Sequence, residues 1–372
     1  MSVSINGTSG LTFNDGSAQT TAATGFGFKN RIINGAMVID QRNAGASVTP
    51  STSGGGTYTL DRWFGQVSQN SKMTVQQNAG SVTPPAGFTN YLGVTSSSAY
   101  SVAAGDYFSI RQQIEGFNTA DLGFGTANAS TVTLSFWVRS SLTGTFGATI
   151  QSFFNGASTR TYPFTYTISA ANTWEYKTVT ISGDTTGTWV GATNGVGISV
   201  AFGLGSGSTF SGTAGSWQSG NFIQPTGTVS VVGTNGATWY ITGVQLEKGS
   251  TATSFDYRPY GTELALCQRY CFKMSTTSNY GPYGMGHGVS TTNFRAIIKT
   301  PQTMRAQPTI SFSTASGFQW SFGNALSAIT AEEYGVDAFS VGCTSTGLAA
   351  NGGYLLTSAN NTTSSITASA EL

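Results

Sequence analysis

The stretch that decides the fold is Val132-Thr-Leu-Ser-Phe-Trp-Val-Arg139. Its apolar side chains recur at every second position, at Val132, Leu134, Phe136 and Val138, and this spacing places them on one face of a β-strand. The same alternation returns, with polar or small residues between, at residues 108–114, 146–150, 164–168, 196–204, 294–298, 310–312 and 339–343. Turns rich in Gly, Asn and Asp separate these runs. Many short, half-buried strands predict an all-β sandwich or barrel.

Composition supports a folded chain with an unusual surface. Charged residues make up only 8% of the 372 residues and glycine accounts for 49, whereas 38% are hydrophobic and 12% aromatic. The apolar share is sufficient to offset the entropy of ordering, which a disordered chain cannot do. Ser, Thr, Asn and Gln therefore supply the polarity, and the length allows two β-domains.

The charge pattern argues against two classes of partner. The net charge is +1 and no Lys/Arg cluster occurs, so the sequence offers no positively charged surface for nucleic acid or for an anionic membrane. No run of about 18 apolar residues occurs, and the start lacks a basic region followed by an apolar one. We expect neither a nucleic-acid nor a membrane partner, and we expect synthesis in the cytosol.

One segment breaks the strand pattern. Leu264, Cys267, Tyr270, Cys271 and Met274 follow a helical spacing. The sequence predicts a short helix that begins at Glu263 behind a Thr262 cap and joins two β-domains. We expect domains at residues 28–260 and 261–372, and residues 1–27 contain too little apolar material for a core. The three cysteines have neither disulfide nor zinc-site spacing, so they are expected to be free, packed thiols.

The sequence carries no catalytic signature. His287 is the single histidine and has no Gly-x-Ser-x-Gly elbow to accompany it. The acidic residues that a glycosidase would need are scattered singly, so ion pairs such as Asp61-Arg62 and Glu247-Lys248, or turn caps, account for them; the candidates are Asp61, Asp106, Glu115, Asp121, Glu175, Asp184, Glu247 and Asp256. We predict a non-enzyme without a cofactor. A structural calcium ion on Asp61 or Asp256 stays open.

Aromatic residues in small-residue loops suggest a binding surface. Trp189 and Trp217 lie among Gly, Ser and Thr, where a core tryptophan is unexpected, and Tyr280 and Tyr283 lie in a Gly-rich stretch. A flat ring beside hydrogen-bonding side chains suits the face of a sugar, so these four residues are the predicted carbohydrate contacts. The alternative is that the rings pack under long loops or at subunit contacts.

Three segments resemble a recurrent class of bacteriophage tail-fibre and virion structural proteins. They are Gly10–Ala23, similar to the N-terminal segment of many fibre proteins; Asn30–Arg42 with Leu60-Asp-Arg-Trp63, similar to the opening of their jelly-roll module; and Val244 to Tyr270, the most specific of the three. Asn14 and Cys271 depart from the common pattern, at positions that are usually proline and aromatic. Met304–Thr309 and Ala368–Leu372 look like the small C-terminal β-domain of such chains.

The resemblance implies both architecture and role. It implies a jelly roll related to carbohydrate-binding modules at residues 28–260, a smaller β-domain at 261–372, and a virion-attachment segment at 1–27. It also implies a homotrimer assembled in the host cytoplasm that binds other virion proteins and, as a tail fibre or receptor-binding protein, a host glycan outside the cell. A purely structural decoration or collar protein and a polysaccharide depolymerase are the alternatives. The motifs are structural, and Trp63 is expected to pack inside the jelly roll.

Overall fold

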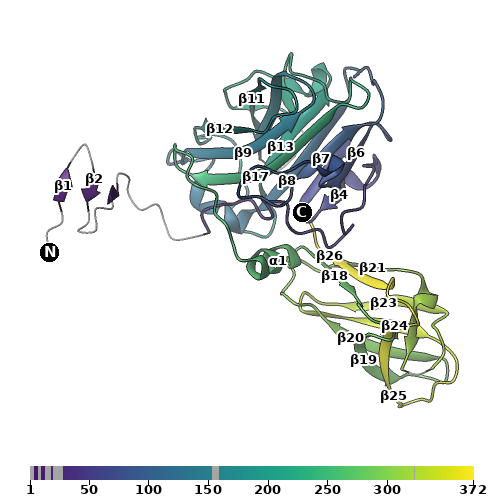
Figure 1. Ribbon diagram of the computed structural model, residues 1–372. Helices are drawn as coiled ribbons and strands as arrows, with labels where there is room; N and C mark the ends of the chain where they lie inside the picture. Colours follow the sequence, from purple (N-terminus) through teal and green to yellow (C-terminus); the bar gives the residue numbers. More distant parts are fainter. Residues whose placement is uncertain (1–3, 7–9, 13–17, 20–27, 153–158, 322) are drawn as a thin grey trace.

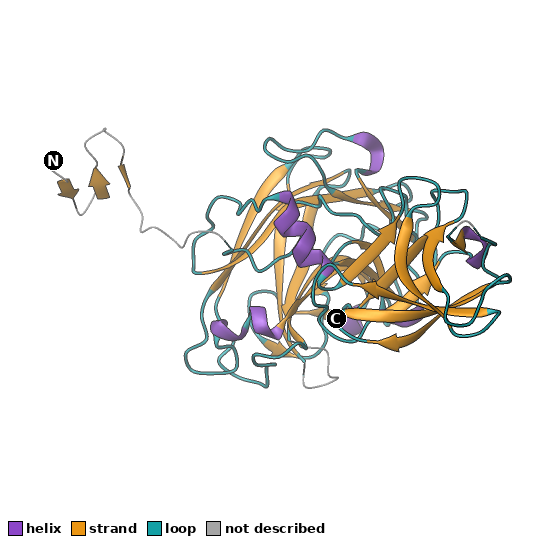
Figure 2. Ribbon diagram, turned by 90° about the horizontal axis from the view of Figure 1, so that it is seen from below, coloured by secondary structure: helices purple, strands orange, loops and turns teal. Residues whose placement is uncertain are grey.

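The protein is described by a computed structural model that covers residues 4–6, 10–12, 18–19, 28–152, 159–321 and 323–372. Figure 1 shows a large β-sandwich followed by a smaller set of sheets, with the helix α1 (Tyr260–Gln268) between them. Strands dominate both parts in Figure 2. The expected fold class, an all-β jelly-roll sandwich followed by a smaller β-domain with one short helix at the junction, is confirmed.

Two antiparallel sheets form the sandwich. The first has the order β15 (Gln218–Ser219), β11 (Arg160–Ile168), β10 (Gly144–Gln151), β13 (Val196–Ser206), β8 (Tyr107–Glu115), β5 (Trp63–Val67) and β4 (Thr57–Leu60). The second has the order β12 (Glu175–Ile181), β9 (Val132–Ser140), β17 (Thr238–Lys248), β7 (Leu92–Ser96) and β6 (Met73–Gln77). The period-two runs of the sequence supply the long central strands of both sheets.

The core lies between these sheets. Phe136 on β9 and Phe202 on β13 meet across it with ring centroids 5.1 Å apart. Trp63 is 0% exposed, and its indole nitrogen donates to the Asn34 carbonyl at 3.1 Å. The prediction that Trp63 packs inside the jelly roll is therefore confirmed.

A crossing segment covers part of the outer face of the first sheet. It contains η6 (Ser208–Phe210) and the parallel pair β14 (Ser211–Gly212) and β16 (Gln224–Pro225). Gly147 and Gly203 on the underlying strands make room for it, since an added Cβ would lie 2.6 and 2.8 Å from the Gln224 Cβ. The crossing segment leaves the rest of that outer face uncovered, and a groove lies there.

The helix differs from its predicted bounds. It begins at Tyr260 behind Pro259, whose carbonyl accepts from the backbone N–H groups of Thr262 and Glu263, so Thr262 lies inside the helix and does not cap it. Proline fits a helix start because its missing N–H has no role there. The helix ends at Gln268, and Met274 lies on a strand because pairing with the C-terminal strand overrides the helical spacing.

The smaller part has its own sheets and core. One sheet has the order β18 (Cys271–Ser275), β26 (Ser365–Ser369) and β21 (Thr309–Phe312). The other has the order β22 (Phe318–Trp320), β25 (Gly353–Ser358), β19 (Pro282–Gly288), β20 (Asn293–Lys299), β24 (Ala338–Thr344) and β23 (Ala328–Tyr334). Buried residues such as Phe294 and Val341 fill the space between them.

Short elements complete the chain. The N-terminal segment holds β1 (Ser4–Asn6), β2 (Gly10–Thr12) and β3 (Ala18–Gln19), which pair as one small sheet. The other 3-10 turns are η1 (Ser53–Gly55), η2 (Ala79–Ser81), η3 (Gly116–Asn118), η4 (Ala120–Leu122) and η7 (Ala315–Gly317). None of the helices among the described residues has the length and apolar character to span a membrane.

Ion pairs and free thiols lie at the junction of the two parts. Glu115 on β8 accepts from Arg269 at 2.6 Å and from the Tyr270 hydroxyl at 2.6 Å. Arg62 pairs with Glu371, and its guanidinium lies 3.6 Å from the centre of the Tyr270 ring. All three cysteines are free and buried, as predicted, and burial raises the pKa of Cys271 and Cys343 to about 12.

Candidate functional site

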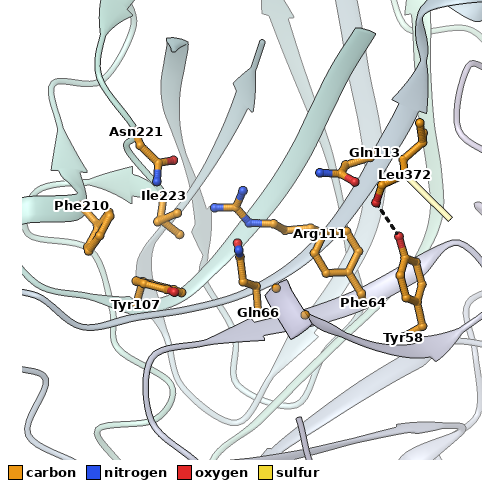
Figure 3. Close-up of a pocket in the computed structure, with 12 residues that line it drawn as sticks. Tyr58, Phe64, Gln66, Tyr107, Arg111, Gln113, Phe210, Asn221, Ile223 and Leu372 are labelled. Carbon is orange, nitrogen blue, oxygen red and sulfur yellow. Dashed lines mark hydrogen bonds between the residues drawn. The ribbon is translucent and has the colours of Figure 1, made fainter. Parts of the chain in front are cut away.

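The groove lies on the outer face of the first sheet and encloses about 330 Å³. One wall is the crossing segment, and the other is the edge formed by β4 and β5. Figure 3 shows the lining residues, with the guanidinium of Arg111 in the middle. The lining consists of Gly55, Gly56, Tyr58, Phe64, Gln66, Tyr107, Arg111, Gln113, Phe210, Asn221, Ile223 and Leu372.

Strand alternation on β8 positions the floor of the groove. Phe108, Ile110 and Ile114 point into the core, so Arg111 and Gln113 take the opposite face. On the neighbouring strand β13, Ala201 stands opposite Arg111 and Ser199 opposite Gln113. Because these neighbours are small, a hollow remains beside the longer side chains of β8.

Neutral groups hold the Arg111 guanidinium. Its Nε donates to the Ser109 hydroxyl at 2.9 Å, and its Nη1 donates to the Gln151 side-chain oxygen at 3.0 Å. Gln151 is itself fixed, since its amide donates to the Asn221 side chain at 3.0 Å and to the Phe222 carbonyl at 2.8 Å. The guanidinium is therefore oriented before any ligand arrives.

Several buried polar atoms on this face lack a partner. Arg111 Nη2, Gln113 Oε1 and Ser199 Oγ are shielded from solvent and make no hydrogen bond within the described chain. A buried donor or acceptor without a partner costs about 1–3 kcal/mol. Buried polar groups in folded proteins nearly always have a hydrogen-bond partner. Several unpartnered polar atoms near one cavity therefore indicate a place where polar ligand atoms bind.

Aromatic rings stand at both ends of the groove. Tyr107 and Phe210 meet edge to face with centroids 4.9 Å apart, and Tyr58 and Phe64 lie 5.1 Å apart. In Figure 3 these two pairs flank the polar centre on opposite sides. Leu372 borders the Tyr58 end, where its carbonyl oxygen accepts from the Tyr58 hydroxyl at 3.2 Å. Flat apolar rings around a few fixed polar groups form the ordinary chemistry of a small-molecule site.

Comparison with known proteins gives structural likeness alone. No protein family model and no curated protein matches the chain. Solved carbohydrate-binding modules resemble its fold. One, described as CBM4 structure and function, is 15% identical and covers 58% of this chain and 98% of its own, with a TM-score of 0.29.

Two further modules give similar values. A family 11 module from Clostridium thermocellum, in complex with a β-1,3-1,4-mixed-linked tetrasaccharide, is 12% identical over 55% of this chain and 98% of that one, with a TM-score of 0.28. The CBM22-1 xylan-binding domain from Paenibacillus barcinonensis Xyn10C is 12% identical over 56% and 99%, also with a TM-score of 0.28. None of these likenesses assigns a ligand to this chain.

The structure brings the two predicted tryptophans together, away from the lining of the groove. Trp189 and Trp217 meet edge to face at 5.4 Å, and both contact Phe124. Both rings are half-buried, and their indole nitrogens donate to protein acceptors, Trp217 to the Ser182 carbonyl at 2.7 Å. Trp189 also lines a cavity of about 200 Å³. Satisfied nitrogens and mutual packing favour the packing interpretation, and their sugar contact stays a prediction.

The two predicted tyrosines lie in the smaller part and differ in exposure. Tyr280 is 51% exposed beside β19. Tyr283 is 5% exposed, packs on Phe318 and donates its hydroxyl to the Ser364 carbonyl at 2.6 Å. An exposed ring is therefore ruled out for Tyr283, which lies at a register shift of β19 and packs into the core, whereas Met285 on the same strand is exposed. His287 lies exposed on the same strand.

The scattered carboxylates have structural partners, although not their neighbours in sequence. Asp61 accepts from Gln41, and Arg62 pairs with Glu371, because adjacent side chains point in different directions. Glu247 likewise accepts from Thr253 and not from Lys248. Burial raises the pKa of Asp61 to about 6.

Metal-ligand groups do not cluster among the described residues. No set of three or more His, Cys, Asp or Glu side chains gathers there, and Asp256 accepts from the Asn30 backbone at 3.3 Å. A calcium ion held by Asp61 or Asp256 together with backbone carbonyls needs no such cluster and stays a prediction.

Proposed function

We propose that the protein is a non-enzymatic saccharide-binding component of a bacteriophage particle and that the saccharide binds in the groove around Arg111. The carrying observation is a pair of unpartnered polar atoms on groove-lining residues, Arg111 Nη2 and Gln113 Oε1, between two pairs of aromatic rings. Rings receive the apolar faces of a sugar, and fixed donors and acceptors receive its hydroxyls. No Asp or Glu is among the residues that line the groove, so the lining offers no pair of carboxylates for glycoside cleavage.

The place of the protein in a virion is supported by sequence resemblance. The segments at residues 10–23, 30–42 and 244–270 resemble tail-fibre proteins. On this basis we propose that the chain is a homotrimer in the virion, that residues 1–27 attach it to other virion proteins, and that the groove faces a host glycan outside the cell. Repeated display would raise the avidity of weak single sites.

The test of saccharide binding is a glycan array probed with the purified full chain and with Gln66→Trp. Gln66 lines the groove on β5, and a tryptophan there fills the cavity without disturbing the inward face of the strand. Binding by the native chain and its loss in Gln66→Trp are expected. A second substitution, Tyr176→Trp on the opposite sheet, controls for the added ring, since Tyr176 is exposed on β12.

Antibody labelling of intact particles tests the virion role separately. Label on the particle, together with loss of label when residues 1–27 are deleted, is expected. An array without any bound saccharide would remove the binding function and leave the purely structural interpretation. An unlabelled particle would remove the virion assignment.

A further inference from the structure

The charge of the groove indicates which class of saccharide it binds. Two arginines are buried within the described residues, Arg62 at 1% and Arg111 at 5% exposure. Arg62 has the carboxylate of Glu371 as its partner. Across the described chain no carboxylate lies within 4.0 Å of the Arg111 guanidinium, which is held by a hydroxyl and an amide.

Burying a cation without a counter-charge is costly. The effective penalty is several kcal/mol for each ion, and hydrogen bonds to neutral groups offset it only in part. Burial lowers the pKa of Arg111 to about 10, so the guanidinium still carries its charge at neutral pH. The groove therefore contains a permanent positive charge with one nitrogen, Nη2, unused.

We infer that the groove selects a saccharide that bears a carboxylate, such as a uronic or sialic acid, and that Arg111 receives this carboxylate. The inference rests on the proposed function, because it names the ligand class of the same groove. A carboxylate supplies the missing counter-charge and an acceptor for Nη2, and a charge-assisted hydrogen bond is about twice as strong as a neutral one.

The surroundings fit one anionic group within a larger neutral ligand. Among the described residues that line the groove, Arg111 is the one cation, so a polyanion gains no further ion pair from them. Gln113 and Ser199 stand opposite each other across β8 and β13, each with an unused side-chain oxygen. Of the two, Gln113 lines the groove, so its oxygen can accept from a hydroxyl of the sugar that carries the carboxylate or of its neighbour.

The decisive experiment compares acidic polysaccharides with their carboxyl-reduced forms, which keep the linkages and lose the charge. Oligosaccharides of hyaluronan, polygalacturonate and a sialylated glycan, each with its reduced counterpart, are titrated calorimetrically into the full native chain. At least one acidic member is expected to bind about tenfold or more tightly than its reduced form. This comparison requires no variant, so it remains decisive even where a substitution fails to fold.

Variants then assign the preference to one residue. Arg111→Gln is expected to reduce the acidic preference to less than about threefold. Arg139→Gln removes the same charge from the other sheet, where Arg139 bonds to the Asn172 carbonyl, and should leave the preference intact. Circular dichroism and melting confirm the fold of each variant.

The outcomes separate the two proposals. Equal binding of acidic and reduced forms, abolished for both by Gln66→Trp, would overturn the carboxylate inference and leave saccharide binding in the groove. An acidic preference that survives Arg111→Gln would overturn the role of Arg111. No binding of any probe, together with a blank glycan array, would remove the saccharide function itself.

Discussion

Two regions next to β8 each bury an arginine, and they differ in how its charge is compensated. At the junction, Arg62 has Glu371, the Tyr270 ring and the Gln113 carbonyl as partners. In the groove, Arg111 has neutral partners and an unused nitrogen. The first region supplies its own counter-charge, although Arg62 Nε lacks a partner, and it holds the two parts of the chain together. The second has no carboxylate within 4.0 Å among the described residues, and this missing counter-charge is what distinguishes it from the first.

The largest effect should follow from Glu371→Gln. This substitution leaves Arg62 buried without a counter-charge, and breaking a buried pair in this way costs about 3–5 kcal/mol. Chemical denaturation of the native chain and the variant measures the change. Glu332→Gln is the matched control, because Glu332 pairs with Arg295 at the surface and should cost less than about 1 kcal/mol. Equal losses in both variants would mean that the junction is not held by its buried charges.

A smaller loss of stability is expected from Trp217→Ala. The half-buried ring packs against Trp189, Tyr162 and Phe124, so its removal should cost about 1–3 kcal/mol. Saccharide binding should persist, because Trp217 is not among the residues that line the groove. Calorimetric titration of saccharide into the folded variant tests this. A loss of affinity would mean that the tryptophan pair contacts the sugar.

Lowering the pH should reduce the stability contributed by the junction and leave the groove unchanged. Burial alone would raise the pKa of Glu115, but hydrogen bonds from Arg269 and Tyr270 outweigh it and lower that pKa below the ordinary value of 4.5. A lowered pKa stabilises the fold above the ordinary value, and this contribution disappears as the pH falls through the folded-state pKa. Differential scanning calorimetry from pH 7 to about pH 3 should show the loss, and Glu115→Gln should flatten that part of the profile. An unchanged profile in this variant would contradict the assignment.

The smallest effect on stability should come from Arg111→Gln. Loss of the hydrogen bonds to Ser109 and Gln151 is offset by removal of a buried, unpaired charge, so the free energy of unfolding should change by less than about 1 kcal/mol. Denaturation under the conditions used for Glu371→Gln gives a direct comparison. A loss as large as that of Glu371→Gln would make Arg111 a structural residue and remove the contrast between the two regions.

The sequence by itself determined the class of the fold. Period-two alternation gave the central strands, such as residues 132–138 and 196–204, because the inward side chains of a half-buried strand must be apolar whatever their partners. The resemblance predicted the buried Trp63, and the spacing of the cysteines predicted free thiols. Local periodicity failed at Met274, where pairing between β18 and β26 overrides a helical spacing.

Only the tertiary structure decided the site. Alternation on β8 places Arg111 on the face opposite Phe108 and Ile110. The sequence could therefore have predicted that Arg111 points away from the core, and no other signal for its role was available. Whether an outward arginine has a partner depends on strands that are distant in the chain: Ala201 leaves the hollow, Gln151 fixes the guanidinium, and no carboxylate of the described residues lies within 4.0 Å of it. Composition and spacing report which groups a chain carries. The absence of a counter-charge is a property of the space around a residue, and only folding creates that space.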